Sequence, residues 1–186
     1  MFNYSKITKV PQMDFSNAAN LSYLFGNCSI TEANINTDKA GAISNLFSSC
    51  KYLHTVSEMN VSNVTSNVSQ YSSPFYTCYA LRNFGGFKGL KVNMYIGDCR
   101  ILSYESLMNV INKLADGVSG KTLYLHQDCV NQLSDDDIAI ATNKGWSISP
   151  ARTITEPVVV TNLNQIPSTT YQITPRTYDF SQYSGS

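Results

Sequence analysis

The sequence lacks an excess of either charge, and it lacks any long apolar run. Its 13 basic and 13 acidic side chains cancel, and only 14% of the 186 residues are charged. Binding to nucleic acid or to an anionic membrane depends on an excess of positive charge, which is missing here. No run of about 18 apolar residues occurs, so no membrane-spanning helix is predicted. We therefore expect no nucleic-acid partner and no membrane insertion.

Paired cysteines and an export signal are also missing. The five cysteines are an odd number, and no two have Cys-x-x-Cys spacing. A disulfide framework or a zinc site is therefore not expected. The first residues, MFNYSKITKVPQMDFS, contain neither an apolar stretch nor a small-residue cleavage site. We expect that the chain is not exported by the general secretory route.

Uncharged polar residues are abundant. Ser, Thr, Asn and Gln make up 63 of the 186 residues, and Tyr adds another 12. Such a composition suits extended structure and surfaces that form many hydrogen bonds better than it suits catalysis. It predicts a binding or structural protein, although these residues also fill ordinary turns.

Four segments share one frame, in which an aromatic or aliphatic residue stands three positions before a cysteine and an aliphatic residue follows two or three positions after it. The cysteines are 22, 28 and 21 residues apart. This period is typical of leucine-rich repeats, in which successive coils of chain stack about 4.8 Å apart. Stacked thiols that point the same way suit a disulfide poorly, so we expect free, buried cysteines. The segments are residues 21–30, 43–53, 71–81 and 92–102.

After Cys99 the spacing changes to that of alternating helices and strands. Ser103 is predicted as the N-cap of the first helix, with Gly117 closing that helix. Ser134 and Asp137 form a capping-box pattern at the start of the second. The order strand, helix, strand, helix, strand predicts an α/β fold with helices on one outer face. The segments expected as helix, strand, helix and strand are residues 104–115, 121–126, 134–144 and 146–148.

The composition changes again from residue 150 onward. Residues 151–186 contain four charges, no cysteine and three prolines, and the stretches 158–160 and 171–173 are predicted as short strands. We expect two parts: a short leucine-rich-repeat-like solenoid with two helices in its C-terminal cap section over residues 1–149, and an extended β-rich assembly arm over residues 150–186. The alternative for the arm is a loose C-terminal tail.

Several of these stretches resemble the BspA-type leucine-rich-repeat family, found on bacterial surfaces and in tail or fibre proteins of phages that infect gut bacteria. The stretches are ISNLFSSCKYL, NVSNVTSNV, FGGFKGLKV, LSYESLMNVINKLADGVSGKTLYL and LSDDDIAIATNKGWSIS. The resemblance covers residues 21–149 and is most specific over 85–149. NINTDKAGA and Pro74 depart from it, and residues 151–186 lie outside it. The resemblance implies a non-enzymatic adhesive or structural solenoid without defined catalytic residues.

The candidate chemical sites all have simpler structural explanations. The three consecutive acids that begin at Asp135 fit the N-terminal end of a helix better than a cation site. The stretch GGFKG lacks the spacing of a phosphate-binding loop and predicts a turn. His54 and His126 are isolated, and no cysteine stands in a recognisable constellation with either. We predict no catalytic residue, no metal site and no cofactor.

Tyrosine is the one residue class that suggests a binding face. Tyr71, Tyr76, Tyr79 and Tyr95 fall near successive coils, where they could form a polar-aromatic strip that stacks on sugars or contacts protein. The alternative is that half of them belong to the core.

These observations lead us to expect a subunit of a phage virion, associated with the tail or fibre. Its partners would be other virion proteins, it would occur in multiple copies, and its outer surface could recognise a host protein or glycan. The alternative is an adhesin module on the bacterial cell surface. An enzyme that cleaves glycans would need a pair of carboxylates across a cleft, and no persuasive pair is present.

Overall fold

The computed structural model describes residues 2–10 and 15–153. The chain divides into two units, Met1–Ile154 and Thr155–Ser186, and the description below concerns the first. All of the expected arm beyond residue 153, including both of its predicted strands, lies outside the described residues. Within them the fold is α/β, with three α-helices, one 3₁₀ turn and eight short strands. No helix there is long and apolar enough to cross a membrane.

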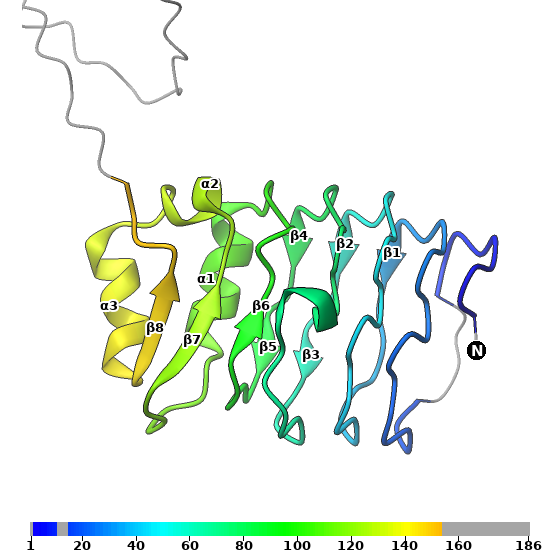
Figure 1. The fold of residues 1–186 in the computed structure, drawn as a ribbon, viewed down its shortest axis with the longest axis horizontal. Helices are drawn as coiled ribbons and strands as arrows, with labels where there is room; N and C mark the ends of the chain where they lie inside the picture. The colour runs from blue at the N-terminus through cyan, green and yellow to red at the C-terminus, as the bar shows by residue number, and fades with distance from the viewer. Residues whose placement is uncertain (1, 11–14, 154–186) are drawn as a thin grey trace, which may run out of the picture. The chain divides into compact units, whose positions relative to one another are not determined.

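The strands form three small sheets, and every pairing is parallel. Each pairing joins strands from two neighbouring turns of the chain. Successive turns therefore lie side by side from the blue to the yellow end of Figure 1. The first sheet has the order β1-β2-β4, the second β3-β5 and the third β6-β7-β8. Their bounds are β1 Glu32–Ala33, β2 Thr55–Val56, β3 Met59–Asn60, β4 Asn83–Phe84, β5 Phe87–Lys88, β6 Met94–Tyr95, β7 Lys121–Tyr124 and β8 Trp146–Ser149.

The aromatic residues that precede the cysteines stack along the interior. The rings of Phe25 and Phe47 are 5.6 Å apart, those of Phe47 and Phe75 are 6.0 Å apart, and both pairs are within 8° of parallel. Phe2 extends the stack, 5.5 Å from Phe25. The frame therefore begins one turn earlier than the sequence analysis placed it, with Ser5 standing where later turns have a cysteine. Each such pair contributes about 0.5–1.5 kcal/mol beyond the burial of its area.

The cysteines are all free and buried, as predicted. Four of the five also have a role that the sequence analysis did not anticipate, because their thiols join neighbouring turns. The thiols of Cys28, Cys50 and Cys78 donate to the carbonyl oxygens of Phe2, Phe25 and Phe47 at 3.0, 3.0 and 2.9 Å. Each of these carbonyls already accepts a backbone N–H from its own turn, and the thiol adds a second donor that a purely apolar side chain could not supply.

The first α-helix, α1 (Tyr104–Asn112), begins at Ser103 as predicted, and the Ser103 side chain accepts from the backbone N–H of Ser106. Ser106 is buried. Its hydroxyl donates to the carbonyl of Arg82 and accepts from the N–H of Phe84. Helix α1 therefore completes the hydrogen bonding of the last strand in the first sheet.

The predicted end of this helix was wrong. Helix α1 stops at Asn112, whereas the prediction extended it to residue 115 and had Gly117 close it. Leu114 instead pairs in parallel with Leu90, because its side chain is needed in the core of the next turn. Gly117 lies further on, with a φ of 68°.

The remaining cap elements follow the prediction with one addition. Helix α3 (Asp135–Asn143) begins with the predicted capping box between Ser134 and Asp137, and β8 follows it. The addition is a short helix, α2 (Gln127–Val130), which carries Cys129. The thiol of Cys129 donates to the carbonyl of Cys99 at 3.3 Å, so the thiol contacts between turns extend into the cap. A single 3₁₀ turn, η1 (Gln70–Ser72), was also not predicted.

The glycine-rich stretch from Gly85 to Gly89 is only in part the predicted turn. Gly85 and Gly86 turn the corner between β4 and β5, and Phe87 and Lys88 form β5. A Cβ on Gly86, where φ is 94°, would lie 2.6 Å from the carbonyl oxygen of Asn109 in α1. Glycine at this corner therefore lets α1 pack closely against the chain.

Candidate binding surface

The four tyrosines proposed from sequence lie at the surface, and none belongs to the fully buried core. Tyr71 and Tyr79 are exposed, whereas Tyr76 and Tyr95 are partly buried. The alternative that half of them are core residues is therefore wrong. Tyr71 lies in η1, and its ring meets that of Tyr76 edge-on, 6.0 Å away. Tyr79 instead lies under the guanidinium carbon of Arg100, 4.7 Å from its ring centre.

Tyr95 has a neighbour that the sequence analysis missed. Strands β6 and β7 pair so that Tyr95 stands opposite Tyr124, and residues opposite each other in a sheet share a face. Their ring centres are 6.2 Å apart with 32° between the ring planes. The alternation of β7 contained the signal, because placing Leu123 and Leu125 inside implies that Tyr124 points outward.

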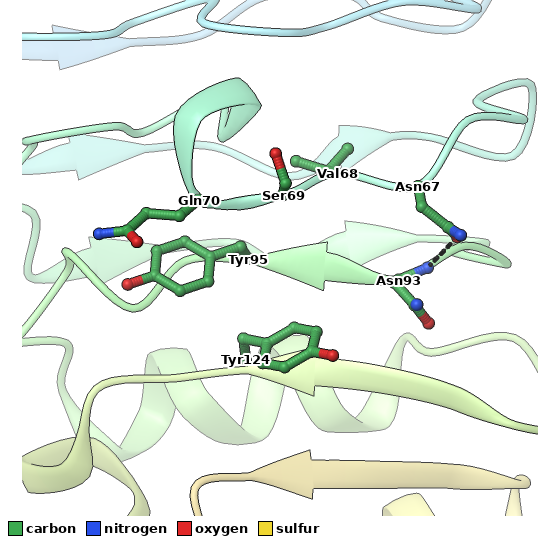
Figure 2. A pocket seen from close by; sticks show the side chains of 7 residues that line it. All are labelled: Asn67, Val68, Ser69, Gln70, Asn93, Tyr95 and Tyr124. Atoms are coloured by element: carbon green, nitrogen blue, oxygen red, sulfur yellow. Dashed lines mark hydrogen bonds between the residues drawn. The ribbon is translucent and has the colours of Figure 1, made fainter.

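The two rings form one wall of a hollow of about 330 Å³. Residues 67–70 of the preceding turn lie along its opposite side, and strands β6 and β7 form its floor, as Figure 2 shows. In that view the hydroxyl groups of Tyr95 and Tyr124 point toward opposite ends of the hollow. The lining residues are Asn67, Val68, Ser69, Gln70, Asn93, Tyr95 and Tyr124.

Two asparagines hold the three turns of this hollow together. The Oδ1 of Asn67 accepts from the backbone N–H of Asn93 at 3.0 Å, and the Oδ1 of Asn93 accepts from the N–H of Thr122 at 2.9 Å. These backbone donors fix the orientation of both amide groups, because only the oxygen can accept. The Nδ2 groups make no further hydrogen bond within the described part of the chain, and their N–H donors remain for a ligand.

Gly97 sets the position of the Tyr95 ring. A Cβ at residue 97 would lie 2.7 Å from both the Cζ and the hydroxyl oxygen of Tyr95, so the ring rests directly on this glycine. Burial raises the pKa of the Tyr95 phenol, and the nearby negative charge of Asp98 raises it further. The phenol is therefore a neutral donor and acceptor at physiological pH.

A second hollow of about 290 Å³ lies between the first sheet and α1, and its walls include Asn83, Ser103 and Glu105. Ser103 and Ser106 are already engaged in the start of α1. Nearby, Lys113 pairs with Glu58 at 2.8 Å and donates to the carbonyl of Gly85. These hydrogen bonds and this ion pair hold α1 and the neighbouring turn in place. They leave Ser103, Ser106 and Lys113 already engaged, so these side chains do not form an acid and base pair for catalysis.

Four of the five buried thiols, those of Cys50, Cys78, Cys99 and Cys129, are poor nucleophiles. Burial raises the pKa of Cys50 from its ordinary value of 9.0 to about 12 and that of Cys129 to about 11, and it raises those of Cys78 and Cys99 well above 9.0. Because the thiolate is the reactive form, these cysteines are unreactive at neutral pH. Among the described residues, no group of three His, Cys, Asp or Glu side chains is placed to hold a metal ion.

Comparison of the chain with protein-family models, with curated proteins and with solved structures finds no match.

Proposed function

We propose that the chain is a non-enzymatic structural and binding subunit, built as a short leucine-rich-repeat-like solenoid with helices in its C-terminal cap section. The observation that carries the proposal is the recurrence of one contact, the thiol of a cysteine donating to a carbonyl one turn earlier, at Cys28, Cys50 and Cys78. Repetition of one internal contact fixes the turns in register and leaves their outer residues free to vary. In such a fold we expect the residues on the outer surface to carry the function.

We propose further that this subunit is part of a phage virion, associated with its tail or fibre. The support is the resemblance to BspA-type leucine-rich repeats over residues 21–149, together with a surface hollow whose lining residues, Tyr95 and Tyr124 among them, are uncharged. In this proposal the segment from residue 150 onward docks on other virion proteins, in multiple copies, and the solenoid braces the assembly or displays a surface to the host.

The test is mass spectrometry of phage particles purified from a culture that expresses the chain, followed by antibody labelling to locate it. We expect the chain to copurify with tail proteins and the label to appear on the tail or fibre. Particles that lack the chain would overturn the virion assignment. Label on the bacterial envelope in place of the particles would favour the cell-surface adhesin.

A further inference from the structure

We propose that the hollow between residues 67–70 and strands β6 and β7 binds a neutral oligosaccharide. This inference rests on the proposed function, because it assigns a ligand class to the outer surface of that solenoid. Three features carry it: a pair of tyrosine rings, a set of amide groups with unused donors, and an absence of charge among the lining residues.

The tyrosine rings provide the apolar contact that a sugar ring needs. Pyranose rings present a face of C–H groups, and such a face packs on an aromatic ring whose edge hydroxyl can bond to a sugar hydroxyl. Tyr95 and Tyr124 come from adjacent strands and are 6.2 Å apart. They therefore form a continuous platform longer than a single ring. Tyr124 is 36% exposed, and both rings line the same hollow.

The amide groups provide matching polar contacts. Asn67 and Asn93 use their oxygens to hold the backbone, which fixes each Nδ2 group with its donors available. Gln70 faces the same hollow beside Tyr95 (Figure 2). Its amide makes no hydrogen bond within the described residues, so it offers both a donor and an acceptor. Sugar hydroxyls both donate and accept, and the two asparagine amides, already held by the backbone, meet them without a large loss of side-chain entropy.

Charge and size select among the possible ligands. None of the seven lining residues is charged, so the hollow has no cation to pair with the phosphate of a nucleotide or the sulfate of an acidic glycan. Its volume of about 330 Å³ lies at the lower end of the range for small-molecule sites, about 300–1,000 Å³. A stable protein interface involves about 20–30 residues on each partner, many more than the seven that line this hollow. A short neutral saccharide is the ligand that fits.

The experiment is a glycan array that carries neutral and acidic oligosaccharides, probed with the purified full-length chain. We expect binding to neutral glycans only. Tyr95→Ala and Tyr124→Ala should each weaken the affinity for the best array ligand about tenfold or more, as measured by isothermal titration calorimetry. Tyr52→Ala is the matched control, because Tyr52 is 65% exposed and is not among the residues that line the hollow; it should bind like the wild type.

Two further variants separate binding from folding. Gln70→Ala removes an amide that makes no hydrogen bond within the described chain, so it should weaken binding severalfold at an unchanged melting temperature. Gly97→Ala keeps Tyr95 but displaces its ring, so it should also weaken binding.

The proposal is overturned if no neutral glycan binds, if only acidic glycans bind, or if Tyr95→Ala and Tyr124→Ala bind as the wild type does. It is equally overturned if a protein partner occupies this face. The mass spectrometry of phage particles does not depend on glycan binding. A negative glycan result would therefore overturn the ligand proposal alone, and the virion proposal would still be decided by the particle experiment.

Discussion

The thiol of Cys78 donates a hydrogen bond to the carbonyl oxygen of Phe47, 2.9 Å away and one turn earlier in the chain. Phe47 is also the residue whose ring stacks on Phe75, three positions before Cys78. Phe75 and Cys78 belong to one turn, and both contact Phe47 in the turn before it. Phe75 contacts the Phe47 ring, and Cys78 contacts the Phe47 carbonyl. This double contact fixes both the spacing and the rotation of neighbouring turns.

The first prediction concerns the thiol hydrogen bond. Cys78→Ser retains a second donor to the Phe47 carbonyl, whereas Cys78→Ala leaves this carbonyl with the backbone N–H of Cys50 as its one remaining donor in the described chain. We expect the alanine variant to be less stable than the serine variant by about 1 kcal/mol, the usual net worth of such a bond. Urea denaturation of both variants measures the difference. Equal stability, or a more stable alanine variant, would show that the thiol acts only by filling space.

The second prediction concerns alkaline pH. The pKa of Cys50 is about 12 in the folded chain, against an ordinary value of 9.0. Between these two values the thiol ionises in the unfolded chain but stays protonated in the folded one. The free energy of unfolding therefore keeps its full value below pH 9 and falls as the pH rises toward 12. The loss is about 1.4 kcal/mol per pH unit for each such thiol. Urea denaturation between pH 8 and pH 11 should show this decline, and Cys50→Ala should reduce its slope.

The third prediction concerns Asp137 at the start of α3. Burial favours the protonated form of this side chain, but hydrogen bonds from Ser134 and from the Tyr104 hydroxyl outweigh burial and lower its pKa below 3.8. The stability that Asp137 contributes is therefore complete above pH 3.8 and is lost as the pH falls through the folded-state pKa. Asp137→Asn should lower the free energy of unfolding at pH 7 by about 1–2 kcal/mol.

The matched control is Asp136→Asn, an exposed acid in the same first turn of α3. It should change the stability by less than about 0.5 kcal/mol. The difference between the two variants should shrink as the pH is lowered toward 3. A difference that stays constant with pH would mean that the ionised carboxylate is not what stabilises this turn.

The fourth prediction compares two glycines with similar backbone angles. Gly145 has a φ of 89°, and a Cβ there would lie only 1.7 Å from the carbonyl oxygen of Val118. Gly117 has a φ of 68°, with nothing within 4 Å of such a Cβ. Gly117→Ala should cost only the backbone strain of about 1–2 kcal/mol. Gly145→Ala adds a backbone collision and should cost about 3 kcal/mol or more. Thermal unfolding of both variants tests the ranking.

The sequence by itself determined the features that depend on residues close together in the chain. The position of a phenylalanine three residues before Cys28, Cys50 and Cys78 was enough to predict a shared interior frame, because neighbours in one turn keep a fixed relation to each other. The capping box of Ser134 and Asp137 was predictable for the same reason, since its hydrogen bonds span only three residues.

Only the tertiary structure decided the features that depend on the register between turns. The end of α1 could not be predicted locally, because Leu114 leaves the helix to pair with Leu90 in the preceding turn. The candidate site has the same origin: parallel pairing places Tyr95 opposite Tyr124, and the amides of Asn67 and Asn93 align because each holds the backbone of the following turn. A shift of one residue in that pairing would turn Tyr124 toward the core.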